Sequence, residues 1–423
     1  MAANGRDGRP EMTGTTVDHA ARWAWMREAT PATRKYAYLN AGWSGPLSTG
    51  VADAMRRRID LELEHGPTTK IVNEDRQALG VRLRSATAQM LGADVDEIAI
   101  TGNTTEGVNI AVNGVALKAG DRVVTTSIEH GGGMIPAYWT RRKYGTDLAI
   151  VHIEGSDGSG EIVERFDQAL GNAAKLVILS EISFSTGQVL PLAEITRLAH
   201  ARGATVVVDG AQTAGHIPID AHALGIDAYA VPSHKWLCGP DGLGMLYVRR
   251  DRIADLDPVK VSGHAAASYD FDGAFEEERN KVTKFEVSTN STPVLAGTLV
   301  AVEQYLESGP QAVWDRVRAL TRYGEERVGG IRGVELTGGR TEATRSGLFF
   351  FAIPGVDPAH LAAYLQGEGQ IVCRSVRQVG SVRLSLHVYN TESEIDRVAA
   401  LVTSVVAAGG VPEQYRGTTG PEA

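Results

Sequence analysis

The chain reads Ser233-His234-Lys235-Trp236-Leu237-Cys238-Gly239-Pro240 a little past its middle. Lys235 follows an apolar run and precedes a Gly-Pro turn. Upstream, a second apolar run ends in Asp209, and the interval between Asp209 and Lys235 is about long enough for one helix and one strand. A carboxylate and a lysine are therefore expected at the ends of two neighbouring strands.

Strand-like runs alternate with helical stretches around this pair, between about residues 97 and 250. Most runs are rich in Val and Ile and almost continuously apolar, as expected of strands that are covered on both faces. The expected strands are Glu97–Thr101, Arg122–Ser127, Leu148–Ile153, Leu176–Ser180, Thr205–Asp209, Ala228–Val231 and Gly244–Val248. The alternation predicts an α/β fold with a large, mostly parallel seven-stranded sheet.

The length of 423 residues exceeds what one hydrophobic core usually serves, so we expect two domains. A long helix is expected at Gly297–Val328, followed by strands at Gly347–Ile353, Ile371–Ser375 and Val382–Val388 and a final helix that opens with a Thr391/Glu394 capping box. The expected divisions are disordered tails at 1–15 and 411–423, an N-terminal segment at 16–61 that packs with the small domain, a large cofactor-binding domain at 62–295 and a smaller C-terminal α/β domain at 296–410.

Composition excludes several classes of protein. Hydrophobic residues make up 43% and charged residues 22%, as in ordinary globular proteins, and the net charge of −9 comes without a concentrated basic segment. We therefore expect neither a nucleic-acid nor a membrane partner. Two cysteines allow no disulfide framework, and no paired-cysteine spacing indicates a metal site. Residues 1–15 contain no apolar signal-peptide core, so a cytoplasmic location is expected.

The Asp209/Lys235 pair matches the requirements of pyridoxal 5′-phosphate (PLP). A lysine amine forms a Schiff base with the PLP aldehyde, and a carboxylate keeps the pyridine nitrogen protonated so that the ring accepts electrons. Ligands of parallel sheets gather at the carboxyl ends of the strands, where both residues are expected. The sequence therefore predicts PLP as the cofactor, with Lys235 and Asp209 as catalytic residues.

Other polar side chains are expected at the same edge of the sheet. Thr104 and Thr105 open a helix directly after a strand, and backbone N–H groups at a helix start attract phosphate. His130 follows the next strand and can stack on a planar cofactor. Gln212 offers an amide to the phenolic oxygen of PLP, and His234 can turn toward the phosphate.

These motifs resemble the class V aminotransferase family of fold-type I PLP enzymes, in the branch of cysteine desulfurases, selenocysteine lyases and isopenicillin N epimerases. The similarity runs from Tyr38-Leu39-Asn40-Ala41-Gly42 to Tyr389-Asn390-Thr391, which is nearly the whole chain. It implies a homodimer in which Lys235 carries PLP, Asp209 holds the pyridine nitrogen and His130 stacks on the ring.

The resemblance also assigns the remaining site residues. It implies that Thr104, Thr105 and His234 hold the phosphate and that Gln212 contacts the phenolic oxygen. Thr289, in Phe285-Glu286-Val287-Ser288-Thr289, would reach the phosphate of the neighbouring subunit. Arg383 would grip the α-carboxylate of the substrate, a task that suits a guanidinium fork. Asn40 and Phe184 would lie on the substrate side.

Three departures from the family pattern bear on the phosphate ligands and on which reactions of the family are expected. Pro232 stands where relatives often carry a serine, and Ser233 is the candidate replacement. Phe184 stands where desulfurases carry asparagine, which is closer to the epimerase-like branch. No cysteine follows Arg374 before the Arg383 strand, so a persulfide-forming desulfurase is disfavoured. Cys238 and Cys373 are expected to serve packing.

The expected function is that of a PLP-dependent enzyme acting on an α-amino acid. The favoured reaction is β-elimination that cleaves the C–S bond of a cysteine S-conjugate in secondary metabolism, giving a thiol, pyruvate and ammonia. Epimerisation at Cα, as in isopenicillin N epimerase, is the second reading. Transamination, or decarboxylation with oxidative deamination, is the third. A PLP-fold protein that has lost catalysis and serves as a binding partner is a further alternative, against which Lys235, Asp209 and Arg383 argue.

Overall fold

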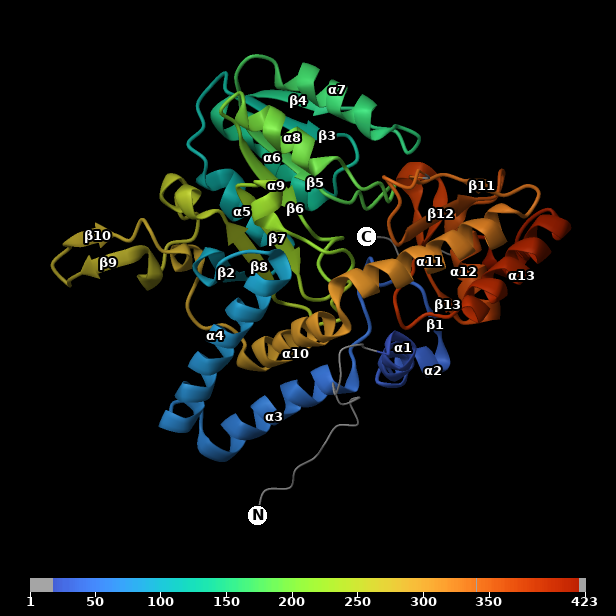
Figure 1. Cartoon of the computed structure of the whole chain (residues 1–423), viewed down its shortest axis with the longest axis horizontal. Coiled ribbons are helices and arrows are strands. Elements are labelled where there is room, and N and C mark those ends of the chain that lie inside the picture. The colour runs from blue at the N-terminus through green and yellow to red at the C-terminus, as the bar shows by residue number, and fades with distance from the viewer. Residues whose placement is uncertain (1–17, 340, 418–423) are drawn as a thin grey trace.

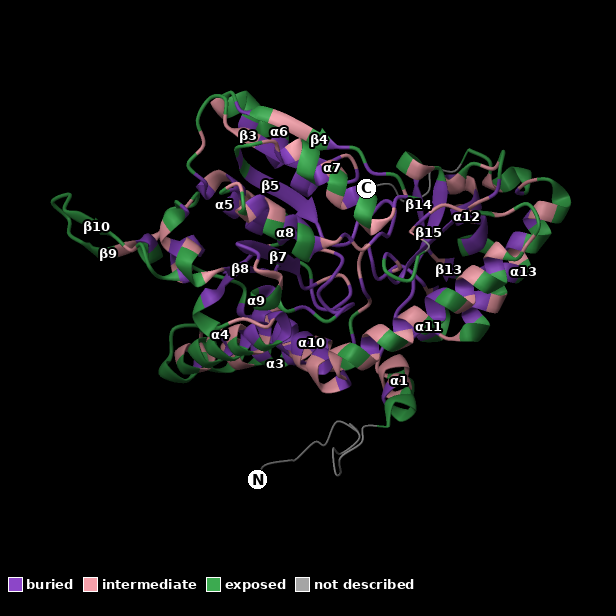
Figure 2. Cartoon of the chain, turned by 45° about the horizontal axis from the view of Figure 1, so that its top comes forward, coloured by how far each residue is buried: buried purple, intermediate pink, exposed green. Residues whose placement is uncertain are grey.

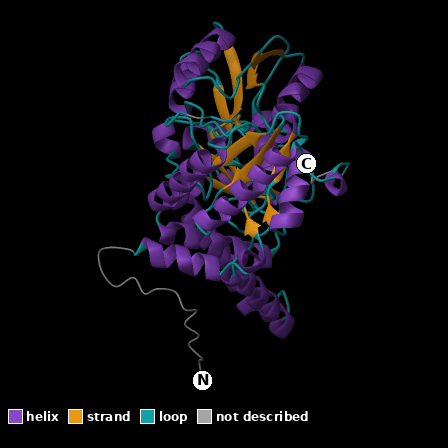
Figure 3. Ribbon diagram, turned by 90° about the vertical axis from the view of Figure 1, so that its right-hand side faces the viewer, coloured by secondary structure: helices purple, strands orange, loops and turns teal. Residues whose placement is uncertain are grey.

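The structure is a computed structural model that describes residues 18–339 and 341–417. A larger part is built around one long sheet, and a smaller part with its own sheet lies beside it (Figure 1). Seen from the side, helices surround the strands of both parts (Figure 3). The predicted disordered tail at 1–15 lies outside the described residues.

The large sheet has seven strands in the order β2-β8-β7-β6-β5-β3-β4. Neighbours pair in parallel except at β8, which is antiparallel to both β2 and β7. The strands are β2 (Ile98–Thr101), β3 (Arg122–Thr126), β4 (Asp147–Val151), β5 (Ala174–Ser180), β6 (Thr205–Asp209), β7 (Ala228–Pro232) and β8 (Gly244–Val248). The predicted α/β fold with a mostly parallel seven-stranded sheet is thereby confirmed.

Both faces of this sheet are buried, which explains the nearly continuous apolar runs. Val206 and Val208 belong to one buried apolar cluster and Val207, between them, to another, because successive strand residues point to opposite faces. The inner strands of the sheet are accordingly coloured as buried in Figure 2, whereas the edge strand β4 is only partly buried. The helices associated with the large part are α3 (Thr49–His65), α4 (Lys70–Leu91), α5 (Thr104–Gly114), α6 (Gly131–Tyr144), α7 (Ser159–Leu170), α8 (Leu192–His200), α9 (Ala221–Leu224) and α10 (Thr292–Ser308).

The smaller part contains a four-stranded antiparallel sheet in the order β11-β12-β15-β14. Its elements are β11 (Glu335–Leu336), β12 (Leu348–Ala352), β14 (Arg374–Val376), β15 (Ser381–Ser385), α11 (Pro310–Gly329), α12 (Pro358–Gly369) and α13 (Glu392–Ala408). The N-terminal segment adds α1 (His19–Glu28), α2 (Ala32–Lys35) and β1 (Ala37–Tyr38), and β1 pairs in parallel with β13 (Ile371–Val372). The start of the described chain therefore packs on the small part.

Two predicted elements of the small part are each divided in the structure. The single helix expected at 297–328 is wrong: α10 ends at Ser308 and α11 begins at Pro310. Gly309, at φ +76°, and the proline that follows it together stop one helix and start the next. The strand expected at 371–375 is likewise two short strands, β13 and β14, which join different sheets on either side of Cys373.

Two further segments complete the described chain. The hairpin of β9 (Ala266–Tyr269) and β10 (Phe275–Glu277) extends away from the large part (Figure 1). At the C-terminal end, Val411 is buried and Tyr415 donates to Glu368 Oε1 at 2.7 Å, so packed chain continues beyond residue 410. Residues 418–423, the rest of the predicted disordered tail, lie outside the described residues.

None of the described helices combines the length and the apolar character that a membrane span requires.

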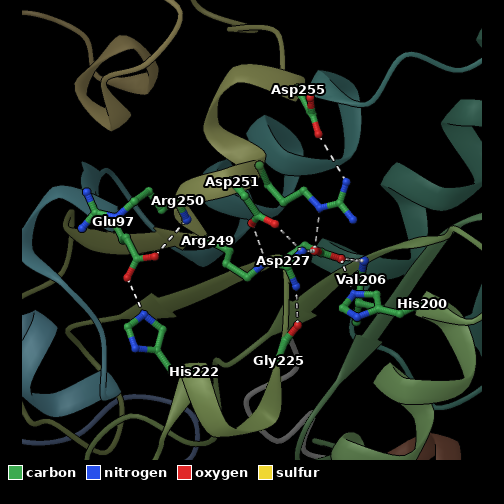
Figure 4. Close-up of polar contacts among 11 residues, drawn as sticks. Glu97, His200, Val206, His222, Gly225, Asp227, Arg249, Arg250, Asp251 and Asp255 are labelled. Atoms are coloured by element: carbon green, nitrogen blue, oxygen red, sulfur yellow. Dashed lines mark hydrogen bonds and ion pairs between the residues drawn. The ribbon is translucent and has the colours of Figure 1, made fainter.

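A charged network lies at the end of the large sheet where strand β7 begins (Figure 4). The buried carboxylate of Asp227 accepts from Val206 N at 2.7 Å, lies 2.9 Å from His200 Nε2, and pairs at 3.0 Å with both Arg249 and Arg252. Burial alone would raise the pKa of this carboxyl, but the hydrogen bonds and cations hold it below its usual value. The opposite edge, at which β5, β6 and β7 end, carries the predicted site residues.

Candidate active site

A pocket opens at the carboxyl ends of these strands and encloses about 650 Å³ of empty space, its mouth included. It gathers residues from five segments of the large part at or after the strand ends, from the N-terminal segment and from one strand of the small part. The lining residues are Trp43, Asn103, Thr104, Thr105, His130, Phe184, Asp209, Ala211, Gln212, His234, Lys235 and Arg374. Eight of the residues predicted from sequence therefore meet in one cavity: Thr104, Thr105, His130, Phe184, Asp209, Gln212, His234 and Lys235.

Asp209 is the last residue of β6 and lies beside Ser180, the last residue of β5, in the parallel register. Its side chain is buried, and Oδ1 accepts from Ala211 N at 2.8 Å. Lys235 follows the end of the adjacent strand β7. The expected placement of a carboxylate and an amine on neighbouring strand ends is therefore what the structure shows.

The Lys235 amine is surrounded by more positive than negative charge. Burial lowers its pKa to about 8, with Arg383 and Arg374 acting in the same direction and Asp209 opposing them. An ordinary lysine has a pKa near ~10.4. A much larger fraction of the Lys235 amine is therefore neutral, and hence nucleophilic, near neutral pH.

We expect the rate at which PLP attaches to the apoprotein to rise with pH and to level off above about pH 8. The neutral amine attacks the PLP aldehyde, so the rate follows the deprotonated fraction of Lys235. The rate of appearance of visible absorbance, measured after mixing across this range, tests the expectation, with Nα-acetyl-lysine as the reference amine. A rate that still climbs steeply at about pH 10 would contradict the lowered pKa.

One end of the pocket is suited to a phosphate. Asn103 caps α5, its side chain accepting from Glu106 N at 2.9 Å, and the helix begins at Thr104. The buried Thr104 Oγ1 has no hydrogen-bond partner among the described residues. The Thr105 hydroxyl and the imidazole of His234 line the same region. A helix start with unused hydroxyl groups is a ready anion site.

His130 caps α6, with Nδ1 accepting from Gly132 N at 3.1 Å. Its ring meets Phe184 edge to face, with centroids 5.2 Å apart and planes at 88°. Burial, followed by the charge of Lys235, lowers the pKa of His130, so a neutral imidazole faces the pocket at neutral pH. This arrangement suits contact with an aromatic cofactor ring.

Two arginines lie in or beside the pocket: Arg374, which was not predicted as a site residue, lines it, and Arg383 is buried next to the lining residue Phe184. Arg383 on β15 is fully buried, and its Nη1 donates to Phe184 O at 3.1 Å. Nε and Nη2 of Arg383 have no hydrogen-bond partner in the part of the chain that the structure describes. Arg374 lies opposite Arg383 in the β14–β15 register and places its guanidinium 5.0 Å from the ring centre of Trp43.

Four lining residues were not predicted as site residues: Arg374, Trp43, Asn103 and Ala211. Asn103 and Ala211 are sequence neighbours of the predicted residues Thr104 and Gln212, whereas Arg374 and Trp43 come from other segments. The signal for Arg374 was its position in the strand that pairs with the Arg383 strand. No local signal marked Trp43, because its place depends on a contact with a strand more than three hundred positions later in the chain. No acidic side chain among the described residues forms an ion pair with either arginine, so the two guanidinium groups favour an anion bound beside them.

Four predicted residues lie outside the lining of this pocket: Arg383, described above, and Ser233, Asn40 and Thr289. The Ser233 hydroxyl is fully buried and bonded to the carbonyl groups of Pro240 and Leu243, the latter at 2.9 Å, so it is not free to replace the missing phosphate serine. Asn40 is buried and bridges to Ser385 on the small sheet. Thr289 lies on an exposed loop with φ +65°, and its role toward a second subunit stays a prediction.

The described residues fit PLP at three of its polar groups. A phosphate matches the unused Thr104 hydroxyl at the start of α5, a pyridine N–H matches the buried Asp209 carboxylate, and an aldehyde matches the Lys235 amine. The buried positive charge of Arg383 remains for a substrate carboxylate. A pocket with these four features has the donor set of a PLP-dependent amino-acid enzyme.

Comparison with known proteins agrees with this geometry. The signature of the aminotransferase class-V family matches residues 72–398. The chain belongs to this family. It is a PLP-dependent enzyme of the class V aminotransferase family, as the sequence motifs indicated.

Relatives of the chain include enzymes of sulfur metabolism. A probable cysteine desulfurase of Methanothermobacter thermautotrophicus is 29% identical over 404 residues, which cover 91% of this chain and 98% of the relative. The cystine C–S lyase C-DES, solved with its reaction product cysteine persulfide, is 28% identical with a TM-score of 0.82 and covers 88% of this chain and 99% of its own. A C-DES mutant carries glycine covalently linked to its PLP cofactor, again at 28% identity and TM-score 0.82, over 89% of this chain and 98% of its own.

Proposed function

We propose that this enzyme cleaves the C–S bond of a cysteine-derived amino acid by β-elimination, and that its physiological substrate is a cysteine S-conjugate of secondary metabolism. Water and the conjugate then give a thiol, pyruvate and ammonia. The observation that carries the proposal is a pocket that fits PLP, with Arg383 buried beside it and no cysteine among the described residues that line it. The likeness to the cystine C–S lyase C-DES over most of both chains supports it.

The roles of the pocket residues follow from their positions. Arg383 binds the α-carboxylate of the substrate with its Nε and Nη2 donors, which have no hydrogen-bond partner among the described residues. Lys235 would hold the cofactor, and its free amine would accept the Cα proton of the substrate. Asp209 keeps a proton on the pyridine nitrogen. Bound PLP supplies the electron sink for this proton removal. His130 and Phe184 form the aromatic wall that excludes water from one side.

Neither cysteine is suited to act as a persulfide-forming nucleophile. Both side chains are buried, and burial raises the pKa of each thiol to about 12. The thiolate is the reactive form of cysteine, so each thiol is almost wholly unreactive at neutral pH. Cys373 lies between β13 and β14, and Cys238 belongs to a small buried cavity next to Trp236 rather than to the active-site pocket.

Incubation of the enzyme with a small panel of cysteine S-conjugates and cystine tests the proposal. We expect thiol or persulfide, pyruvate and ammonia in equal amounts, and we expect the folded Cys238→Ala, Cys373→Ala double variant to keep most of the activity. Alanine formation with loss of turnover in the double variant would instead establish a desulfurase. Racemised amino acid without pyruvate would establish the epimerase reading, and a keto acid paired with an aminated acceptor would establish transamination.

We also propose that the enzyme is a homodimer whose active sites lie near the interface. The β9–β10 hairpin exposes Tyr269, Phe271 and Phe275, an apolar surface that a second copy could cover. Thr289 lies in an exposed loop and would donate to the phosphate in the partner's pocket.

Replacing Thr289 with alanine is expected to weaken PLP retention about 10- to 100-fold, because one hydrogen bond to a charged group is worth roughly 1.5–3 kcal/mol. Dialysis of the holoenzyme followed by titration with PLP measures the change. Ser288→Ala, which removes a hydroxyl from the same exposed loop, is the matched control. A monomer in sedimentation that retains PLP fully would contradict both the dimer and the role of Thr289.

A further inference from the structure

The Gln212 side chain is held on two sides by partners that allow only one orientation of its amide. Trp236 Nε1 donates to Gln212 Oε1 at 2.8 Å, and Gln212 Nε2 donates to Gly42 O at 2.8 Å. An indole only donates and a peptide carbonyl only accepts, so both contacts place the amide oxygen toward Trp236. The second hydrogen of Nε2 has no partner among the described residues and stays available to an acceptor in the pocket.

Trp236 is itself rigidly held. Only 1% of the residue is exposed, and its ring stacks on His216 with centroids 3.7 Å apart and planes at 14°. On the other side, His387 of the small part donates from Nε2 to Trp236 O at 2.9 Å, because a carbonyl can only accept. The residue next to the cofactor lysine is thus fixed by contacts from both parts of the molecule.

His216 fixes the main chain of Gln212 in the same way. Its Nδ1 donates to Gln212 O at 2.7 Å, and its Nε2 accepts from Gly347 N at 2.8 Å. These two contacts require a neutral ring with the proton on Nδ1, and complete burial favours the same neutral state. Gln212 is therefore restrained at its backbone by His216 and at its amide by Trp236.

We propose that Trp236 is a positioning residue that aims one N–H of the Gln212 amide at the ring oxygen of PLP. The proposal rests on the contact between Gln212 and PLP that the family resemblance implies. An N–H donated to that oxygen weakens its hold on the proton that it shares with the Lys235 nitrogen. Without this donor the pKa of the shared proton rises, so the proton is lost only at a higher pH.

Trp236→Phe, which keeps an aromatic ring but removes the indole donor, tests this role in the holoenzyme. We expect the titration midpoint of the visible absorbance to move upward by several tenths of a pH unit and the PLP dissociation constant to rise about three- to tenfold. Gln212→Leu should move both quantities at least as far. In the Gln212→Leu background, Trp236→Phe should add almost nothing, because Trp236 acts through Gln212.

Trp314→Phe is the matched control. Trp314 contacts the same His216 ring, with centroids 5.6 Å apart, but makes no hydrogen bond to Gln212 in the described part of the chain, so neither the midpoint nor the dissociation constant should change. If Trp236→Phe does not fold, site-specific β-(3-benzothienyl)alanine at position 236 removes the N–H and keeps the two-ring shape.

Three results would overturn the proposal, and they differ in what they mean. An unchanged midpoint in a folded variant at position 236, beside a shifted Gln212→Leu, would show that Trp236 does not position the amide. Equal shifts from Trp236→Phe in both backgrounds would show that Trp236 acts independently of Gln212. If Gln212→Leu changes neither the titration midpoint nor the PLP dissociation constant, Gln212 does not contact PLP. That result would not affect the C–S lyase proposal, which the product assay tests separately.

Discussion

Replacing Lys235 with alanine is expected to abolish covalent attachment of PLP and to lower turnover by at least about 10²- to 10⁴-fold, the range that a positioned general base contributes. Lys235 lines the same pocket as Asp209, and burial lowers the pKa of its amine to about 8. A nearby water molecule cannot replace an amine that, as proposed above, both holds the cofactor and accepts the Cα proton. The wild-type protein should be yellow, and the variant should lose the absorbance of lysine-bound PLP.

Borohydride reduction followed by peptide mapping gives the decisive measurement. The pyridoxyl label should appear on Lys235 in the wild-type enzyme and on no residue in the variant. Lys175→Ala, which removes an exposed lysine from the far end of β5, is the matched control and should keep both label and activity. A label on another lysine would overturn the assignment of Lys235 and, with it, the proposed acid–base chemistry.

Replacing Arg383 with methionine or alanine is expected to raise the Michaelis constant for an α-amino acid about 10- to 100-fold or more. Each lost charge-assisted hydrogen bond is worth roughly 1.5–3 kcal/mol, and a carboxylate can use two donors of one guanidinium. Arg383→Lys should recover only part of the loss, since an ammonium group cannot make the same paired contact.

Replacing Arg383 is expected to weaken substrate binding without lowering the stability of the fold. Arg383 is fully buried without an acidic partner among the described residues, and burial lowers its pKa to about 9, with Arg374 adding to the effect. Burying an unpaired charge is costly, so Arg383→Met should leave the unfolding temperature of the apoprotein unchanged or higher. A combined fall in stability and affinity would instead identify Arg383 as a structural residue, and unchanged kinetics would point to a substrate without an α-carboxylate.

Several features of the fold could be predicted because their signals are local. Val206–Val208 is continuously apolar, and the structure shows the reason: alternate residues enter two different cores on opposite faces of the sheet. Asp209 is the last residue of one such strand, and Lys235 lies shortly after the end of the next. Both positions could be predicted because ligands of a parallel sheet gather at the carboxyl ends of the strands. The boundary between α10 and α11 at Gly309 also has a local signal, since a Gly-Pro pair stops a helix. The amphipathic pattern continues on both sides of it, however, and predicted one helix instead of two.

Other features depend on contacts between distant segments, and no local pattern encodes them. Ser233 looked like a phosphate ligand from its place beside His234, yet its hydroxyl turns to two carbonyl groups of the following loop. Arg374 enters the site only because β14 pairs with β15, and Trp43 only because the N-terminal segment packs against that sheet.

The sequence by itself determined the sheet, the cofactor and the lysine–aspartate pair, because strand periodicity and strand-end chemistry are properties of short segments. The tertiary structure alone decided the orientation of the Gln212 amide, which is set by Gly42 and by Trp236. It also decided that Arg383 meets Phe184 across the boundary between the two parts. Hydrogen bonds of this kind have strict geometry, and their partners come together only when separately encoded elements pack into one core.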